Sequence, residues 1–282
     1  MQDSSLQLVI DKHIARLTFN RPDAYNSLNK AFWQAFPDAL RRIAQADDVR
    51  VLVIDAQGKH FSAGMDLDFF SQPDPRLFQG EGGRRAEFVY RLVRELQDCF
   101  TQLEQLRIPV LAAIQGGCIG GALDLVCACD CRYATEDAFF CVKETELGMA
   151  ADLGTLQRLP RLISPGLARE LVYTSRKMTA TEAQSAGLVN QIFPDTTALI
   201  EGVLAIAKQI AAQSPLAITG SKQLLNHAQE HNVRDSLDYT AAWQAGMLQP
   251  SDLMESMAAK TQQRPANYAA LQSLNSGWTR ES

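Results

Sequence analysis

The sequence lacks the excess of positive charge that would point to a nucleic-acid partner. Its 282 residues contain 27 Lys and Arg against 32 Asp and Glu, a net charge of −5. This balance disfavours a broad nucleic-acid-binding surface, but it does not exclude an anionic ligand held by a few local groups. The chain also lacks the low hydrophobicity of a disordered protein, because 46% of its residues are hydrophobic. At this length it needs neither disulfides nor a metal to fold.

The spacing typical of disulfide frameworks and zinc sites is also missing. No Cys-x-x-Cys pair occurs, and most of the cysteines fall in or near the most apolar part of the chain. We therefore predict no metal site and small, buried, unpaired side chains at all six cysteines. These are Cys99, Cys118, Cys127, Cys129, Cys131 and Cys141.

Neither end of the sequence carries a recognisable targeting signal. Residues 1–5 lack the apolar run of a secretory signal and the arginines of a transit peptide. Residues 279–282 match no peroxisomal or retention signal. These features predict a cytoplasmic protein.

One stretch is long enough to span a bilayer. Residues 108–129 contain a single charged side chain, Asp124, and about 20 apolar residues suffice for a span. Gln115 and four glycines interrupt the stretch, and no second span occurs. We therefore expect a buried strand, a glycine turn and a buried helix here, and no membrane span.

Apolar runs alternate with helical periodicity over about two thirds of the chain, and helices follow from residue 195 to about residue 263. Such alternation predicts layered sheets with outer helices. The expected elements are a hairpin within Leu6–Asn20, a helix from Ser27 or Asn29 to about Ala46, a strand at Val49–Ile54, a mobile loop at 71–85, a helix at Glu87–Arg107, a strand at Pro109–Gln115, and shorter strands near Cys131–Ala134, Ala138–Val142 and Leu188–Phe193.

Glycines cluster at Gly116–Gly121, between a predicted strand and a predicted helix. The run lacks the Gly-Lys-Ser/Thr ending of a phosphate-binding loop and the Gly-x-Gly-x-x-Gly spacing of a dinucleotide site. Two interpretations remain, which are tight helix–strand packing and an oxyanion site formed by free N–H groups at the helix start. An oxyanion site needs a second donor from another loop, and Phe61–Leu67 is the candidate segment.

Three acids, Asp124, Glu144 and Asp152, lie in apolar surroundings. An apolar site raises a carboxyl pKa and makes the group a useful acid or base near neutral pH. Each acid alone is more simply explained as structural, but together they are candidate catalytic groups.

Two other enzyme classes are weighed against this hypothesis. The segment His227–His231 matches the H-x-x-E-H arrangement of zinc proteases, with both histidines on one helix face. However, the segment is polar and no third ligand is evident. A serine hydrolase is not favoured, because no Gly-x-Ser-x-Gly segment occurs.

Several of these segments, in this order and spacing, resemble the enoyl-CoA hydratase/isomerase (crotonase) superfamily over nearly the whole chain. The resemblance implies an α/β fold in which a spiral of ββα units over residues 1–195 holds the acyl-CoA site. It also implies a helical C-terminal trimerisation segment over residues 196–282, and a homotrimer or a hexamer of two trimers. The matching segments are Leu17–Pro22, Asn26–Leu28, Phe61–Leu67, Gly116–Asp124, Ala128–Asp130, Gly154–Pro160, Ala183–Val189 and Ser214–Leu216.

The resemblance further implies how an acyl-CoA thioester is bound. The backbone N–H groups of Met65 and Gly121 would form the oxyanion hole. Coenzyme A is then part of the substrate, so no separate cofactor is expected. The CoA moiety would lie along Ala63, Gly64, Met65, Asp66 and Leu67.

The acidic residues at positions 124, 144 and 152 distinguish the branches of this family. Hydratases look to carry glutamates at positions 124 and 144, and Gly-x-x-Pro-Gly where this chain reads Gly148–Asp152. Here the first acid is Asp124, and Asp152 adds a third carboxylate. The set Asp124, Glu144 and Asp152 resembles the dienoyl-CoA isomerase branch.

That branch implies conversion of a 3,5-dienoyl-CoA to a 2,4-dienoyl-CoA in fatty-acid β-oxidation. Glu144 would act near the thioester and Asp152 at the distal carbon, or the reverse, with Asp124 orienting them. The alternatives are a 2-enoyl-CoA hydratase, a single-base enoyl-CoA isomerase, or a non-catalytic acyl-CoA-binding module. A zinc hydrolase at His227 and His231 is the remote alternative.

Overall fold

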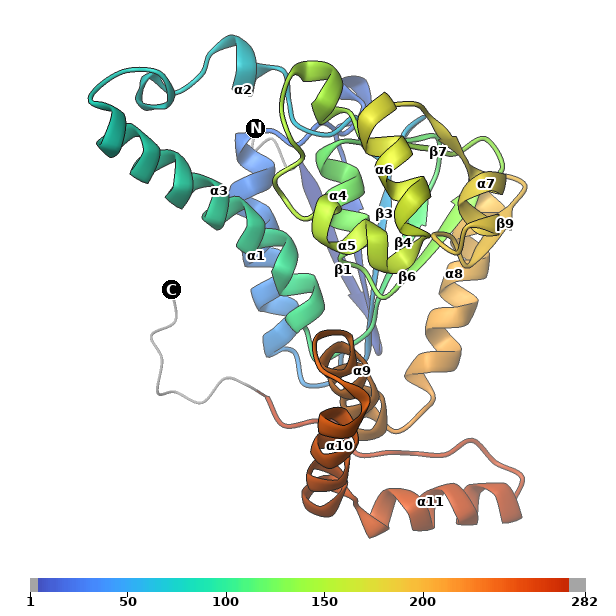
Figure 1. Ribbon diagram of the computed structural model, residues 1–282. Helices are drawn as coiled ribbons and strands as arrows, with labels where there is room; N and C mark the ends of the chain where they lie inside the picture. Colours follow the sequence, from blue (N-terminus) through green and yellow to red (C-terminus); the bar gives the residue numbers. More distant parts are fainter. Residues whose placement is uncertain (1–4, 274–282) are drawn as a thin grey trace.

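Two β-sheets organise the first two thirds of the chain in the computed structural model, which describes residues 5–273 (Figure 1). The larger sheet has the order β1-β2-β3-β4-β6-β9, antiparallel between β1 and β2 and parallel elsewhere. The smaller sheet has the order β5-β7-β8. The strands are β1 (Leu6–Asp11), β2 (Ile14–Phe19), β3 (Val51–Ala56), β4 (Val110–Ile114), β5 (Gly117–Ile119), β6 (Cys131–Thr135), β7 (Phe139–Cys141), β8 (Met178–Thr179) and β9 (Gln191–Phe193).

Helices connect the strands and fill the C-terminal third. The α-helices are α1 (Lys30–Gln45), α2 (Asp68–Ser71), α3 (Gly82–Gln105), α4 (Gly121–Cys127), α5 (Thr155–Leu162), α6 (Pro165–Thr174), α7 (Ala180–Ser185), α8 (Thr196–Ala211), α9 (Pro215–Glu230), α10 (Val233–Met247) and α11 (Pro250–Thr261). Single 3-10 turns form η1 (Pro22–Ala24), η2 (Pro75–Leu77) and η3 (Glu144–Leu147).

The strand order reveals a repeating ββα unit. Strand β4 belongs to the larger sheet, β5 to the smaller one, and α4 follows; β6 and β7 then repeat the pattern before η3 and α5. The preceding turn of the spiral follows β3, where Ser62 forms an isolated parallel bridge with Cys118 of β5. The predicted crotonase-like spiral is therefore confirmed. Successive turns place the loops that follow β3 and β4 next to each other.

The hydrophobic core lies on both faces of the larger sheet. The main cluster packs α1, α4 and the C-terminal half of α3 against one face. On the other face, Leu199, Val203 and Ala207 of α8 pack against Val51 and Leu111. The packing thus joins α8 to the sheet, whereas the division of the chain at residue 195 stays a prediction.

Most predicted elements are confirmed, including the helix that begins after Asn29, whose side chain accepts the Phe32 N–H. The loop predicted at 71–85 is wrong in part. It contains η2, and α3 begins at Gly82 because the Glu81 carboxylate accepts the N–H groups of Gly83 and Arg84. The glycine turn also contains strand β5, which the apolar pattern does not reveal.

The cysteine and membrane predictions can be compared directly with the structure. All six cysteines are free, and all but Cys131 are buried. Residues 108–129 divide into β4, β5 and α4, as the strand, turn and helix interpretation expects. Within residues 5–273, no helix is both long and apolar enough to cross a membrane. The chain ends, on which the targeting prediction rests, fall partly outside the described range.

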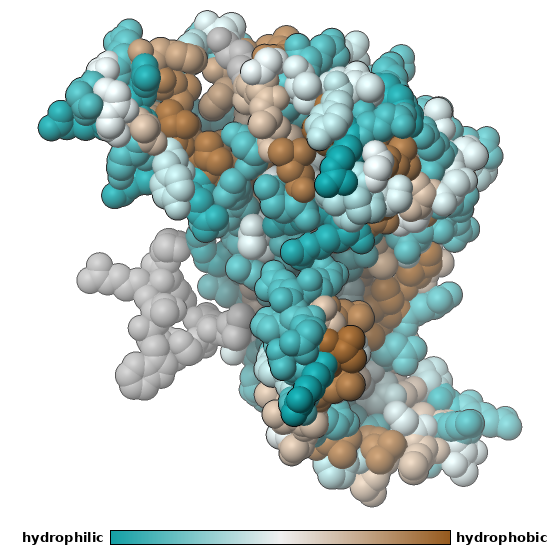
Figure 2. Space-filling model, in the orientation of Figure 1, coloured by the Kyte–Doolittle hydropathy of each residue, from teal (hydrophilic) through white to brown (hydrophobic). Residues whose placement is uncertain are grey.

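Helices α9, α10 and α11 lie at the lower end of the molecule in Figure 1, apart from the two sheets. Helix α10 has no buried residue, and Ala259 is the one described buried residue of α11. Figure 2 shows apolar side chains gathered on this lower part. The exposed apolar residues of these helices include Leu225, Val233, Leu237, Met247, Leu253, Met254 and Met257.

Candidate active site

Two loops that are far apart in the sequence, one after β3 and one after β4, are hydrogen-bonded to each other. The N–H of Phe61 donates to Gln115 O (2.8 Å), and that of Ser62 donates to Gly117 O (3.1 Å). In return, the Ile119 N–H donates to Ser62 O at 3.1 Å. These bonds hold the loop after β3 beside the glycine turn after β4.

The backbone N–H groups of Met65 and Gly121 lie where these two loops meet. Leu28 bonds to the residues on either side of Met65, through Gly64 O (2.8 Å) and the Asp66 N–H (3.3 Å). In such a parallel pairing the Met65 N–H takes no part. A Cβ built on Gly121 would lie 3.8 Å from Met65 N, so the two donors are neighbours. Neither N–H has an acceptor among the hydrogen bonds found within residues 5–273.

Gly64 is needed for this close approach. Its φ is +84°, and a Cβ at this position would lie 2.5 Å from the carbonyl oxygen of Ile119. Any side chain would therefore meet a backbone atom that cannot easily move, in a conformation that disfavours L-residues. The sequence motif around Gly64 thus has a direct steric explanation.

Two polar side chains that the sequence analysis did not single out, those of His60 and Asn26, hold these loops in place by hydrogen bonds to their backbone. The His60 ring nitrogen Nδ1 accepts the Gly117 N–H at 2.8 Å, which requires the form with an unprotonated Nδ1. Burial and then the charge of Lys59 lower the His60 pKa, consistent with that form. Asn26 donates to Gln57 O and His60 O at 2.8 and 2.9 Å. The only sequence signal for either was the position of Asn26 within a family motif.

The other residues predicted to contact CoA surround this junction. Ala63 donates its N–H to Tyr25 O, and Asp66 is held through its carboxylate by Arg21 (2.9 Å) and Ser27 (2.7 Å). Leu67 is 75% exposed. The loop is therefore anchored at both ends and presents an apolar side chain to solvent.

The three predicted acids come from three elements of two successive spiral turns. Asp124 lies in the first turn of α4 and is 1% exposed. Glu144 is the first residue of η3, and Asp152 lies in the irregular segment before α5. The Thr155 N–H at the start of α5 donates to Asp124 Oδ1 at 2.5 Å. This bond ties the helix with the first acid to the segment with the third.

The three acids lie near enough to one another for their charges to affect each other's pKa values. Burial, followed by the charge of Glu144, raises the pKa of Asp124 to about 7. Burial is also the main cause of the raised pKa of Glu144, to which the charge of Asp152 adds. Burial raises the pKa of Asp152 as well. A carboxyl group whose pKa is raised to about 7, as that of Asp124 is, can hold or release a proton near neutral pH.

Glu144 is the acid that lies beside the glycine turn. Its Oε1 would be 3.0 Å from a Cβ built on Gly120, whose φ is +53°. The structure thus brings together the two backbone donors and the acid cluster. Whether these groups act on a substrate stays a prediction.

Replacement of Asp124 by Asn is expected to stabilise the protein at high pH. An acid whose folded pKa is raised from 3.8 to about 7 contributes full stability below about pH 4 and loses it as the pH rises toward 7. Asn keeps the acceptor for the Thr155 N–H, so the variant should gain on the wild type over this range by at most about 4 kcal/mol. Urea unfolding near pH 4 and pH 8 measures the gain. Equal gains at both pH values would mean that Asp124 ionises normally.

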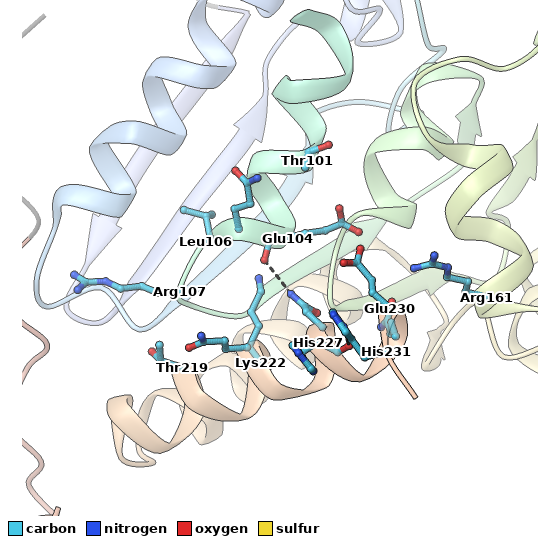
Figure 3. A pocket seen from close by; sticks show the side chains of 14 residues that line it. Thr101, Glu104, Leu106, Arg107, Arg161, Thr219, Lys222, His227, Glu230 and His231 are labelled. Carbon is cyan, nitrogen blue, oxygen red and sulfur yellow. Dashed lines mark hydrogen bonds between the residues drawn. The ribbon is translucent and has the colours of Figure 1, made fainter. Parts of the chain in front are cut away.

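A cavity of about 440 Å³ lies elsewhere, between the C-terminal end of α3 and α9 (Figure 3). His227 and His231 line it, but their rings stack face to face, with centroids 3.8 Å apart. His227 also stacks on Tyr239. Within the described part of the chain, no group of three or more His, Cys, Asp or Glu could hold a metal ion. The geometry therefore gives no support to a zinc hydrolase at this position.

Comparison with known proteins identifies the family. The model of the family "Enoyl-CoA hydratase/isomerase" matches residues 10–270. The chain is 41% identical to the mouse (Mus musculus) mitochondrial Delta(3,5)-Delta(2,4)-dienoyl-CoA isomerase, over 90% of this chain and 78% of the relative. It is 42% identical to the peroxisomal enzyme of that name from Arabidopsis thaliana, over 93% and 94%.

Solved structures agree with this assignment. A crystal structure of an enoyl-CoA hydratase from Bacillus anthracis superposes with a TM-score of 0.84 at 31% identity, over 94% of this chain and 98% of that chain. Another, of a probable enoyl-CoA hydratase/isomerase from Mycobacterium abscessus, has a TM-score of 0.82 at 28% identity, over 95% and 100%.

The prediction of a cytoplasmic protein is wrong, because the dienoyl-CoA isomerases above are named mitochondrial and peroxisomal. Location depends on short segments that receptors read, and such segments are separate from the residues that build the fold. The error about location therefore leaves the prediction of the crotonase-like fold unaffected. With a family model over residues 10–270, relatives above 40% identity and the spiral of ββα units, the chain belongs to the enoyl-CoA hydratase/isomerase family.

Proposed function

We propose that this protein is a dienoyl-CoA isomerase, which converts a 3,5-dienoyl-CoA into a 2,4-dienoyl-CoA. The observation that carries this function is the third acid, Asp152, which lies close enough to Glu144 for its charge to raise the Glu144 pKa. Relatives at 40–42% identity that share this name support the same reaction. An acyl-CoA substrate fits the family as a whole.

The N–H groups of Met65 and Gly121 are proposed to form an oxyanion hole for the thioester carbonyl. Removal of a proton beside a thioester places negative charge on its oxygen, and two donors held in advance stabilise that charge. Their position at the hydrogen-bonded junction of two loops supports this role. The CoA moiety would follow the loop from Ala63 to Leu67.

Two acids are proposed to move the proton. Glu144, which lies beside the glycine turn and so near the carbonyl, removes a proton from C2. The electrons of the C2–H bond first form C1=C2, which places the negative charge on the thioester oxygen. When the carbonyl forms again, this pair becomes C2=C3, the C3=C4 pair becomes C4=C5, and the C5=C6 pair takes a proton from Asp152 to form the new C6–H bond. Asp124, fixed by the Thr155 N–H, keeps the pair oriented. The isomerisation transfers no electrons to or from the substrate, so it needs no redox group, and coenzyme A remains part of the substrate.

The C-terminal helices are proposed to bind a second and a third copy of the chain. The exposed Leu237 and Leu253 of α10 and α11 lack a core of their own, and burying such apolar surface stabilises association. We expect a homotrimer, or a hexamer of two trimers. Light scattering of the purified protein should give three or six times the chain mass, and a monomer would contradict this expectation.

An ultraviolet assay tests the function. We expect a 3,5-dienoyl-CoA to yield the absorption band of the conjugated 2,4-dienoyl thioester, with little loss of the enoyl band in a parallel 2-enoyl-CoA reaction. Loss of the enoyl band alone would identify a hydratase. No change with either substrate, despite measurable binding, would identify an acyl-CoA-binding module. The proposed place of this reaction is fatty-acid β-oxidation, as the resemblance to the dienoyl-CoA isomerase branch implies.

A further inference from the structure

The segment that carries Asp152 has no regular secondary structure. It runs from Gly148, which ends η3, to Thr155, which begins α5. Ala151 and Leu153 are buried on either side of Asp152. Hydrophobic contacts alone leave the direction of a carboxylate loosely defined, so the polar contacts of this segment determine where Asp152 points.

Gln97 of α3 provides such a contact. Its side-chain nitrogen Nε2 donates to the carbonyl oxygen of Asp152 at 2.6 Å. Its Oε1 accepts from Arg94 at 3.2 Å, so both ends of the amide are bonded and its orientation is defined. Gln97 thus links α3 directly to the backbone of the third acid.

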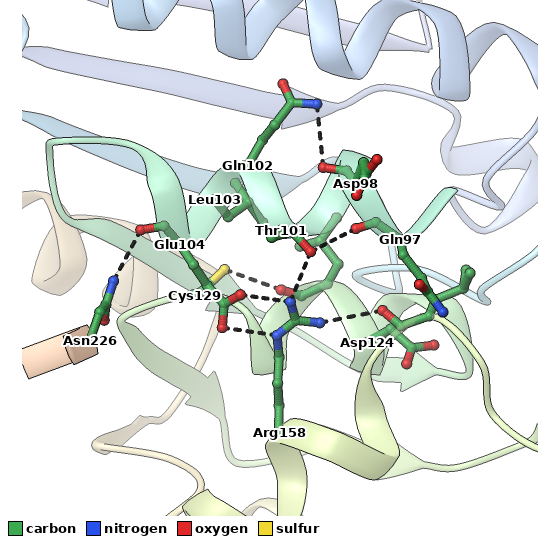
Figure 4. Close-up of polar contacts among 12 residues, drawn as sticks. Gln97, Asp98, Thr101, Gln102, Leu103, Glu104, Asp124, Cys129, Arg158 and Asn226 are labelled. Carbon is green, nitrogen blue, oxygen red and sulfur yellow. Dashed lines mark hydrogen bonds and ion pairs between the residues drawn. The ribbon is translucent and has the colours of Figure 1, made fainter. Parts of the chain in front are cut away.

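A second set of bonds extends the same connection (Figure 4). Arg158 of α5 binds the Glu104 carboxylate at 2.9 and 2.6 Å and donates to Thr101 Oγ1 at 3.1 Å. Thr101 in turn donates to the carbonyl oxygen of Gln97 at 3.0 Å. A Cβ on Gly154 would lie 1.8 Å from Arg158 Nη1, so this glycine makes room for the guanidinium. The residues of α3 therefore hold both sides of the Asp152 segment.

We propose that Gln97 is a positioning residue that aims the Asp152 carboxyl group at the distal carbon of the substrate. This inference rests on the proposed isomerase function. By fixing the Asp152 carbonyl, Gln97 fixes the backbone from which the carboxyl group extends. A displacement of about 1 Å at a reacting group can cost about 100-fold in rate. The thioester end would be unaffected, because none of the Gln97 hydrogen bonds found within residues 5–273 reaches the Met65 loop or the glycine turn.

The test is the Gln97→Met variant, which keeps the side-chain length and removes the donor. We expect kcat to fall roughly 10- to 100-fold with little change in KM. In D2O, the rate of deuterium entry at C6 should fall by the same factor, because each product molecule gains one hydrogen at C6. Exchange at C2 of the recovered substrate should persist, which a general loss of structure would not allow.

The matched control is Gln102→Met on the same helix. The hydrogen bond found for the Gln102 side chain within the described residues goes to Asp98 O of its own helix, at 3.3 Å. The rates of labelling at both carbons and kcat should therefore stay near those of the wild type. Equal losses at C2 and C6 in Gln97→Met, or an unchanged kcat, would overturn the proposal. Absence of 2,4-dienoyl product with the wild type would instead reject the isomerase function itself.

Discussion

Replacement of Asp152 by Asn is expected to lower the turnover of a 3,5-dienoyl-CoA by roughly 10²- to 10⁴-fold, the usual contribution of a general acid or base. Asn has the same shape but cannot exchange a proton. The fold should persist, because Ala151 and Leu153 anchor the segment by burial and Gln97 bonds to its backbone rather than to the carboxyl group. The ultraviolet assay measures the loss, and thermal unfolding checks the fold.

A suitable control is Asp98→Asn on α3, an exposed acid whose nearest cation, Arg94, is 3.9 Å away. It should retain wild-type turnover. Near-normal turnover of Asp152→Asn would remove Asp152 from the mechanism and leave a reaction that depends on Asp124 and Glu144. Deuterium labelling of the variant also decides which acid serves which carbon, since exchange at C2 of the recovered substrate should persist if Asp152 acts at C6 and should be lost if Asp152 acts at C2.

Replacement of Gly64 by Ala is expected to lower kcat by roughly 10²- to 10³-fold, as does removal of one oxyanion donor. The added methyl group would lie 2.5 Å from the Ile119 carbonyl oxygen, so the Met65 loop and the glycine turn must move apart. If the two N–H groups are no longer aligned, they stabilise less well the negative charge that develops on the thioester oxygen in the transition state.

Gly187→Ala provides the control for backbone strain. Gly187 has a φ of +91°, close to that of Gly64, but its nearest neighbour would be 3.4 Å from the new Cβ. We expect some loss of stability and unchanged kcat in this variant. If Gly64→Ala also turned over normally, the two N–H groups would not form the oxyanion hole that we propose.

Sequence patterns with a local cause predicted much of the fold. The helix after Asn29 follows from its cap and from the regular spacing of Phe32, Phe36 and Leu40, all of which are buried. The strand predicted at Val49–Ile54 is a nearly continuous apolar run, as expected where both faces are covered, and it is observed as β3 at Val51–Ala56. Such features depend on residues a few positions apart, so the chain alone specifies them.

The predicted start of α3 failed for a reason that is also local. Glycines and mixed charge before residue 87 indicate a loop, but the Glu81 side chain accepts two N–H groups of the first turn and compensates for the glycines there. The short strand β5 failed for a different reason, since its three residues form a strand only by pairing with β7.

The sequence by itself determined the identities of the candidate groups: the acids Asp124, Glu144 and Asp152 within apolar runs, and the glycines of two loops that match a known family. Only the tertiary structure decided how these groups meet. The pairing of Ser62 with Gly117, the raised pKa of Asp124 beside Glu144, and the bond from Gln97 to Asp152 join residues from separate elements. Spacing along the chain carries no information about such contacts, because strand register and helix packing bring these residues together.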